Sequence, residues 1–201
     1  MKKNVYQFGE TELKDLIVAW VFLSLIFSYR AGFAASGDFL SRFLFILPTL
    51  GLGFIGHELS HKFAAQRYGF WAEFRISYSN LFFALILAMV SPIIFAAPGA
   101  VVIFPVNRHG RMADSGASGR ISLAGPMANL LIVLLFSAAY LFLPLSPALV
   151  SLCQIGIMVN GFLAFFNLIP FSVLDGKKVF RWSKPVWALA FAISLLALYS
   201  V

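Results

Sequence analysis

Two histidines and a glutamate stand together in an otherwise apolar stretch of the chain, in the order His57-Glu58-Leu59-Ser60-His61. On a helix, positions 57 and 61 lie on one face, so both imidazoles can bind one metal ion. Glu58 lies about 100° round the helix from His57, where its carboxylate reaches a water on that metal more easily than the metal itself. Two imidazoles that hold zinc, beside a carboxylate that takes a proton from the water, are the arrangement of a metalloprotease.

The surroundings of this motif are those of a membrane protein. Of the 201 residues 61% are hydrophobic and only 11% are charged, whereas about a quarter of a soluble domain is charged. We expect one integral membrane domain over residues 1–201, all-α and polytopic, with five to six transmembrane helices. The predicted spans are 13–33, 39–67, 121–143, 150–169 and 186–201, and the apolar segment 80–104 either spans or re-enters. Ionisable side chains are costly inside a bilayer, so we interpret the motif as functional.

Two short segments between these spans have the composition of strands. Phe70–Tyr78 alternates apolar and polar residues, and Ala100–Phe104 is rich in β-branched residues. We expect them to form a small interfacial β element. Non-helical backbone at membrane depth is tolerated only where protein buries it or where it lines a cavity. A segment that covers a buried metal site meets that condition.

Membrane topology explains the positive charge of the chain more simply than nucleic-acid binding does. The net charge is +7, and the basic residues lie in short loops between apolar runs. If 80–104 re-enters, 13 of the 15 Lys and Arg lie on one side of the membrane. This bias favours five true spans, with the N-terminus and the metal-site end in the cytoplasm of a cell-membrane protein. The 13 residues are Lys2, Lys3, Lys14, Lys62, Arg67, Arg75, Arg108, Arg111, Arg120, Lys177, Lys178, Arg181 and Lys184.

A catalytic zinc ion needs a third protein ligand beside the two histidines. Glu73 falls in a predicted strand at the wrong depth, and Asp114 falls in a polar loop. Asp175 is the best candidate, because it follows the span 150–169 on the side of the membrane expected for the histidines. Asp175 also precedes Gly176, and Asp-Gly is a common turn sequence. From spacing alone, the ligand role and the turn role of Asp175 are equally favoured.

Three motifs together resemble the site-2 protease family of intramembrane zinc metalloproteases. They are His57-Glu58-Leu59-Ser60-His61, Gly125-Pro126-Met127-Ala128-Asn129, and Asn167 with Pro170 and Leu174-Asp175-Gly176. The resemblance covers about residues 50–180. Two features depart from commoner members of the family: Lys177 stands where a second glycine is frequent, and 80–104 is longer and more apolar than usual.

The resemblance implies roles for five residues and a class of substrate. It implies that His57, His61 and Asp175 bind one Zn²⁺ per chain, and that Glu58 activates the water. It also implies that Asn167 orients the substrate or stabilises the oxyanion. The partner it implies is a transmembrane helix of another protein, cleaved within the lipid bilayer.

The sequence also allows two other functions for the protein, and purely structural roles for some of the residues in these motifs. A metal or proton transporter would use the same buried His, Glu and Asp, but would carry acidic residues on several spans. A catalytically inactive zinc-binding protein would not need Glu58. Packing explains Gly125 and Pro126, and Asn129 either bonds across helices or faces the site. His109 is expected to be an interfacial residue without a ligand role.

Overall fold

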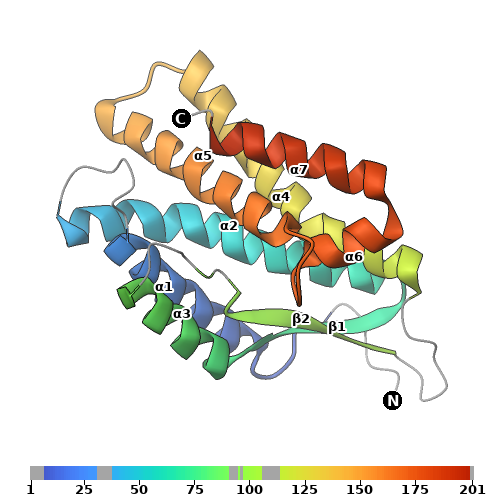
Figure 1. Cartoon of the computed structure of the whole chain (residues 1–201). Coiled ribbons are helices and arrows are strands. Elements are labelled where there is room, and N and C mark those ends of the chain that lie inside the picture. The colour runs from blue at the N-terminus through green and yellow to red at the C-terminus, as the bar shows by residue number, and fades with distance from the viewer. Residues whose placement is uncertain (1–6, 31–37, 91–94, 96, 106–113, 200–201) are drawn as a thin grey trace.

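A computed structural model defines the fold and describes residues 7–30, 38–90, 95, 97–105 and 114–199. Helices make up most of the described chain, and the predicted helical fold with a small β element is confirmed (Figure 1). The elements in chain order are α1 (Glu12–Arg30), α2 (Phe39–Arg67), β1 (Phe70–Ile76), α3 (Tyr78–Val90), β2 (Gly99–Pro105), α4 (Ser115–Phe142), α5 (Pro147–Leu168), α6 (Asp175–Trp182) and α7 (Lys184–Leu198).

Three helices in the described part of the chain are long and apolar enough to cross a membrane: α2, α4 and α5. α3 and α7 are apolar but shorter. The first turn of α1 carries the acidic residues Glu12 and Asp15. Length and composition therefore support three membrane helices, fewer than the five to six expected from the sequence.

α4 begins earlier than the sequence predicts. The expected span starts at 121, whereas the helix starts at Ser115, after the N-cap residue Asp114. The Asp114 side chain accepts a hydrogen bond from the backbone N–H of Ala117 over 2.7 Å. This cap satisfies one free N–H group of the first turn and so favours a helix in a Gly- and Ser-rich segment. His109 lies outside the described residues.

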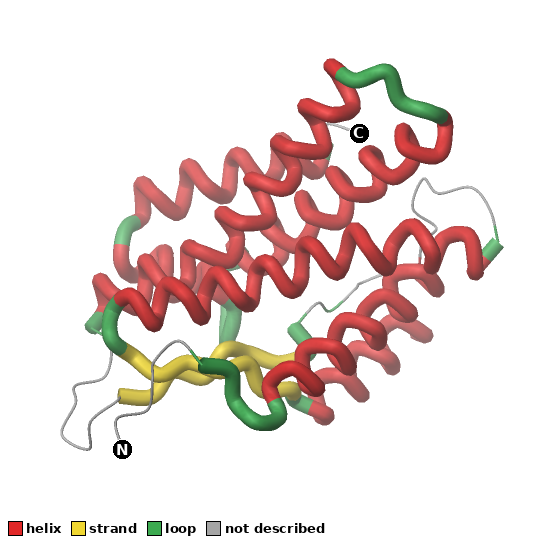
Figure 2. Tube along the Cα trace, turned by 180° about the vertical axis from the view of Figure 1, so that it is seen from behind, coloured by secondary structure: helices red, strands yellow, loops and turns green. Residues whose placement is uncertain are grey.

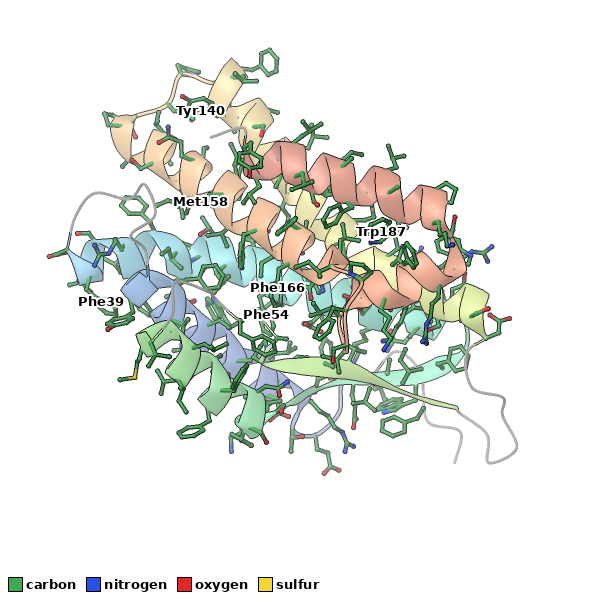
Figure 3. All side chains as sticks on the ribbon, viewed as in Figure 1. Phe39, Phe54, Tyr140, Met158, Phe166 and Trp187 are labelled. Atoms are coloured by element: carbon green, nitrogen blue, oxygen red, sulfur yellow. The ribbon has the colours of Figure 1, made fainter. Side chains whose placement is uncertain are left out.

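α2 lies at the centre of the molecule. It packs against α1 on one side and against α4 and α5 on the other, as Figure 1 and the reverse view in Figure 2 show. The largest group of buried apolar residues lies between α1, α2 and α5. Phe74 of β1 joins this core, where its ring meets that of Phe54, labelled in Figure 3, edge to face with centroids 5.6 Å apart. The strand pair is thus anchored on the helix that carries the two histidines.

β1 and β2 form an antiparallel pair in which Ile76 lies opposite Gly99 and Phe70 lies opposite Pro105. Both predicted strands are therefore present. The chain leaves the pair after Ile76, passes through α3 and returns at Gly99, at the same end of the pair. The two ends of this excursion lie side by side.

Candidate metal centre

Three side chains from two distant parts of the chain meet at one point. His57 and His61 lie on α2, and Asp175 is the first residue of α6. The two imidazole Nε2 atoms are 3.0 Å apart. The Oδ2 atom of Asp175 is 2.9 Å from Nε2 of His61 and 3.3 Å from Nε2 of His57. Three ligand atoms at these separations can hold one metal ion.

The other nitrogen of each ring, Nδ1, is held by α4. Nδ1 of His61 is 2.8 Å from the backbone carbonyl of Ile121, and this contact requires a proton on Nδ1. Nδ1 of His57 is 2.6 Å from Oδ1 of Asn129. The Asn129 amide nitrogen donates to the Gly53 carbonyl and to Asn160 Oδ1, which fixes Oδ1 as the atom facing His57. Both rings therefore donate through Nδ1 and direct the lone pair of Nε2 at the meeting point.

This donor set fits zinc. Two unprotonated nitrogens and a carboxylate oxygen repel one another unless a positive charge lies between them. Ligand atoms placed tetrahedrally round zinc at about 2.0–2.1 Å lie roughly 3.3 Å from one another, close to the separations of 2.9–3.3 Å found here. Two imidazoles with one carboxylate occur in catalytic zinc sites, which leave the fourth position to water or substrate.

Gly125 of α4 leaves the space in front of the two Nε2 atoms open. A Cβ at this position would lie 2.6 Å from Nε2 of His57 and closer still to Nε2 of His61. Any other residue type would therefore fill the place of the metal. The sequence indicates only a packing role for Gly125, because this closeness depends on how α4 crosses α2.

The position of Asp175 depends on the close approach of α6 to the end of α5. A Cβ on Gly176 would lie 2.7 Å from the Ile169 carbonyl oxygen and closer to that of Leu168. The indole N–H of Trp187, labelled in Figure 3, donates to the same Leu168 carbonyl over 2.8 Å. Asp175 and Gly176 thus begin a helix that packs directly against the backbone at the end of α5. The alternative prediction, in which this Asp-Gly pair forms a turn, is wrong.

The Asp175 carboxyl is held in its charged form. Burial raises its pKa, but the Coulomb attraction of a protonated His61 and the hydrogen bonds with both rings lower it by more, so the pKa lies well below the usual range. A metal ion bound by the Nε2 lone pairs supplies the positive charge in place of the Nε2 proton. A carboxylate binds a metal ion in its deprotonated form.

A cavity of about 270 Å³ opens onto the three candidate ligands. Glu58 lines it and is itself buried, at 8% exposure. One wall is formed by β2 from Gly99 to Ile103, and another by the start of α6. The carboxylate of Glu58 and the three candidate ligands thus face one cavity, beside β2.

Two further polar residues line this cavity. Asn167, near the end of α5, donates one amide hydrogen to the Leu163 carbonyl over 2.9 Å, which leaves its second amide hydrogen for another partner. Lys178 stands three positions after Asp175 on α6 and faces the same space. Sequence reasoning missed Lys178, although a spacing of three residues on a helix places both side chains on one face.

Glu73 and Asp114, the two acids that the sequence analysis rejected as third metal ligand, lie away from the candidate metal centre. Glu73 of β1 accepts hydrogen bonds from the side chains of Arg75 and Trp71, and Asp114 caps α4. Neither belongs to the group of possible metal ligands in the described residues.

Two named proteins are similar to this chain. The sequence matches no protein-family model, and no solved structure matches it. It is 34% identical over 186 residues, 92% of each chain, to a protein of Methanocaldococcus jannaschii named "Putative zinc metalloprotease MJ0611". It is 29% identical over 156 residues to "Putative zinc metalloprotease YwhC" of Bacillus subtilis, covering 70% of this chain and 69% of that protein. Because the identity with the archaeal protein extends over almost the whole of both chains, this chain belongs to the same family, that of the zinc metalloproteases.

Proposed function

We propose that this protein is an intramembrane zinc metalloprotease of the site-2 protease type, which hydrolyses peptide bonds within or near transmembrane segments of other proteins. One observation carries the proposal. His57, Glu58 and His61 lie on α2, a helix long and apolar enough to cross a membrane, and Asp175 of α6 meets them in the same cavity.

His57, His61 and Asp175 are the proposed zinc ligands. When bound, zinc lowers the pKa of its water toward neutrality and polarises the peptide carbonyl. Glu58 accepts the proton of the attacking water and then donates it to the leaving nitrogen. Its place beside His57 on α2 and its access to the cavity support this role. The second amide hydrogen of Asn167 is free to bind the substrate carbonyl and so to stabilise the oxyanion.

The substrate is a transmembrane helix that unwinds locally, because a helix hides its peptide carbonyls. An unwound segment in lipid needs partners for its backbone groups. β2 offers them, since it pairs with β1 on one edge and forms a wall of the cavity. We propose that the substrate adds as a strand to β2. Crosslinks from single cysteines along 99–103 to a bound substrate are expected, and their absence along that whole stretch would contradict strand addition.

The proposed setting is the cell membrane, crossed several times, with the N-terminus and the metal centre toward the cytoplasm. In this topology α1 and α7 join the three longer helices as spans, and α3 with β2 forms a re-entrant segment. The pairing of Ile76 with Gly99 supports re-entry, since it holds both ends of the segment together. The partners are then the lipid bilayer and a substrate helix, with no nucleic acid.

A transporter is less favoured than a protease. α4 and α5 contain no Asp or Glu, and Glu58 is the one acidic residue of α2. A path for ions or protons across the membrane would need further polar carriers on these helices.

The test compares the wild type with Glu58→Gln in detergent micelles or liposomes, with a transmembrane-helix fusion as substrate and bound zinc measured in both. We expect Glu58→Gln to keep stoichiometric zinc and to lose cleavage. Asp175→Asn is expected to lose zinc as well. Zinc with no cleavage by the wild type over a panel of substrates would favour a zinc-binding protein without protease activity. A wild type that binds no stoichiometric metal would overturn the proposal.

A further inference from the structure

A buried ion pair lies next to the metal centre and takes no part in the proposed reaction. Lys62 directly follows His61 on α2, and its Nζ atom is 2.5 Å from a carboxylate oxygen of Glu12, the first residue of α1. Each side chain is 1% exposed. The ring of Phe8 covers the ammonium group at 4.2 Å. Burial of two charges is costly, so the pair needs further partners to be maintained.

The Glu12 carboxylate finds such partners on β1. Its Oε1 atom accepts the backbone N–H of Phe74 over 3.1 Å. One turn later on α1, Oδ2 of Asp15 accepts the backbone N–H of Ile76 over 3.3 Å. These two N–H groups are two residues apart and so point to the same edge of the strand. The first turn of α1 therefore closes the outer edge of β1.

The register of the β1–β2 pair then determines which backbone N–H and C=O groups of β2 point away from β1. In an antiparallel pair, a residue that directs its N–H away from the partner strand lies opposite a residue that also directs its backbone groups outward. Phe74 lies opposite Val101, and Ile76 lies opposite Gly99. Gly99 and Val101 thus direct their N–H and C=O groups to the free edge of β2, meaning the edge with which no other strand of the described residues pairs. Both residues line the cavity with the candidate metal ligands.

We infer that Glu12 is a positioning residue, which ties β1 to Lys62 beside the metal ligand His61 and thereby sets the free edge of β2 at a fixed distance from the metal. The inference rests on the proposed peptide hydrolysis and on strand addition to β2. A substrate strand held on this edge presents one peptide bond to the metal. When the link that Glu12 makes between Lys62 and β1 is removed, the strand pair shifts against α2. Several neighbouring peptide bonds of the substrate then reach the metal.

The test uses the full chain in liposomes and maps the cleaved bonds of a transmembrane substrate by mass spectrometry. Glu12→Leu with Lys62→Met removes the link without leaving an unpaired buried charge. We expect stoichiometric zinc, kcat at least tenfold lower, and cleavage spread over neighbouring bonds. Glu12→Gln with Lys62→Met keeps an oxygen for the Phe74 N–H and is expected to restore the single cleavage site in part. Glu10→Gln, an exposed acid two positions away, is the control and should match the wild type.

Each outcome bears on the inference. A loss of rate without any spread of cleavage sites would mean that Glu12 only stabilises the fold, and the inference would be wrong. Unchanged rate and site in the Leu variant would also overturn it. If that variant does not fold, Asp15→Ala, at a partly exposed position, removes the second contact to β1 and must spread the cleavage sites. A wild type that binds zinc but cleaves no substrate would instead refute the proposed function, and this inference with it.

Discussion

The two imidazoles of the metal centre differ in how they are held. His61 donates to a backbone carbonyl, which no substitution at Ile121 can remove. His57 donates to a side chain, Asn129, which is fully buried and is itself fixed by Gly53 and Asn160. The orientation of one proposed ligand therefore depends on a single amide group. Such second partners commonly change metal affinity by about 10–100-fold.

Replacement of Asn129 is expected to weaken zinc binding. Asn129→Leu removes the acceptor for Nδ1 of His57, so we expect zinc affinity to fall about 10–100-fold, measured by competition with a chelator. Asn160→Leu is the matched control at an equally buried position. It leaves Asn129 bonded to Gly53 and is expected to change the affinity only a few-fold. An equal loss in both variants would indicate that the effect arises from helix packing.

Gly125→Ala is expected to remove zinc without unfolding the protein. The added Cβ would lie 2.6 Å from Nε2 of His57, in the space that a metal needs. Alanine favours a helix over glycine by about 1 kcal/mol, so helix stability is not the cause of the loss. Metal analysis and a thermal melt followed by circular dichroism would check both parts. Gly116→Ala, in the same helix but in ordinary contact with Asp114, is the control and should keep its zinc.

At the scale of elements, the sequence predicts what local patterns encode and misses what depends on packing. Long runs of apolar residues place the helices, and the alternation in Phe70–Tyr78 predicts β1. The first turns of α4 were missed, because a cap by Asp114 overrides the flexible composition of the segment. The role of Asp175 stayed undecided, because only the contact between α5 and α6 shows that Asp-Gly begins a helix here.

The contact between α5 and α6 predicts a second route to loss of the metal. Gly176→Ala places a Cβ against the carbonyl groups of Leu168 and Ile169. Backbone atoms cannot move aside as a flexible side chain can, so α6 must shift and carry Asp175 away from the histidines. We expect lower zinc occupancy and a lower melting temperature. Lys177→Ala changes the next residue of the helix without such a contact and is expected to keep both. Full zinc in Gly176→Ala would contradict this account of the α5–α6 contact.

At the scale of the whole molecule, α2 connects the candidate metal centre to α1, α4 and β1. It carries two proposed ligands and Glu58, meets α4 at the groups that hold the imidazoles, and meets α1 and β1 through Lys62 and Glu12. The motif on α2 could be read from the sequence. Its partners on α4 follow 60 and 72 positions later, and no local pattern links such distant residues.

The path of residues 80–104 predicts the sidedness of the chain. Since Ile76 pairs with Gly99, the segment is expected to enter the membrane and return, which leaves 13 of the 15 basic residues on one side. In a chain with its one cysteine changed, Cys153→Ala, new cysteines at Ser77 and Ser115 should react with an impermeant maleimide from the same side of a vesicle. A cysteine at Ser146, whose side chain makes no cap hydrogen bond, should react from the other side. Labelling of positions 77 and 115 from opposite sides would mean that 80–104 crosses the membrane, and the basic residues would then divide between its two faces.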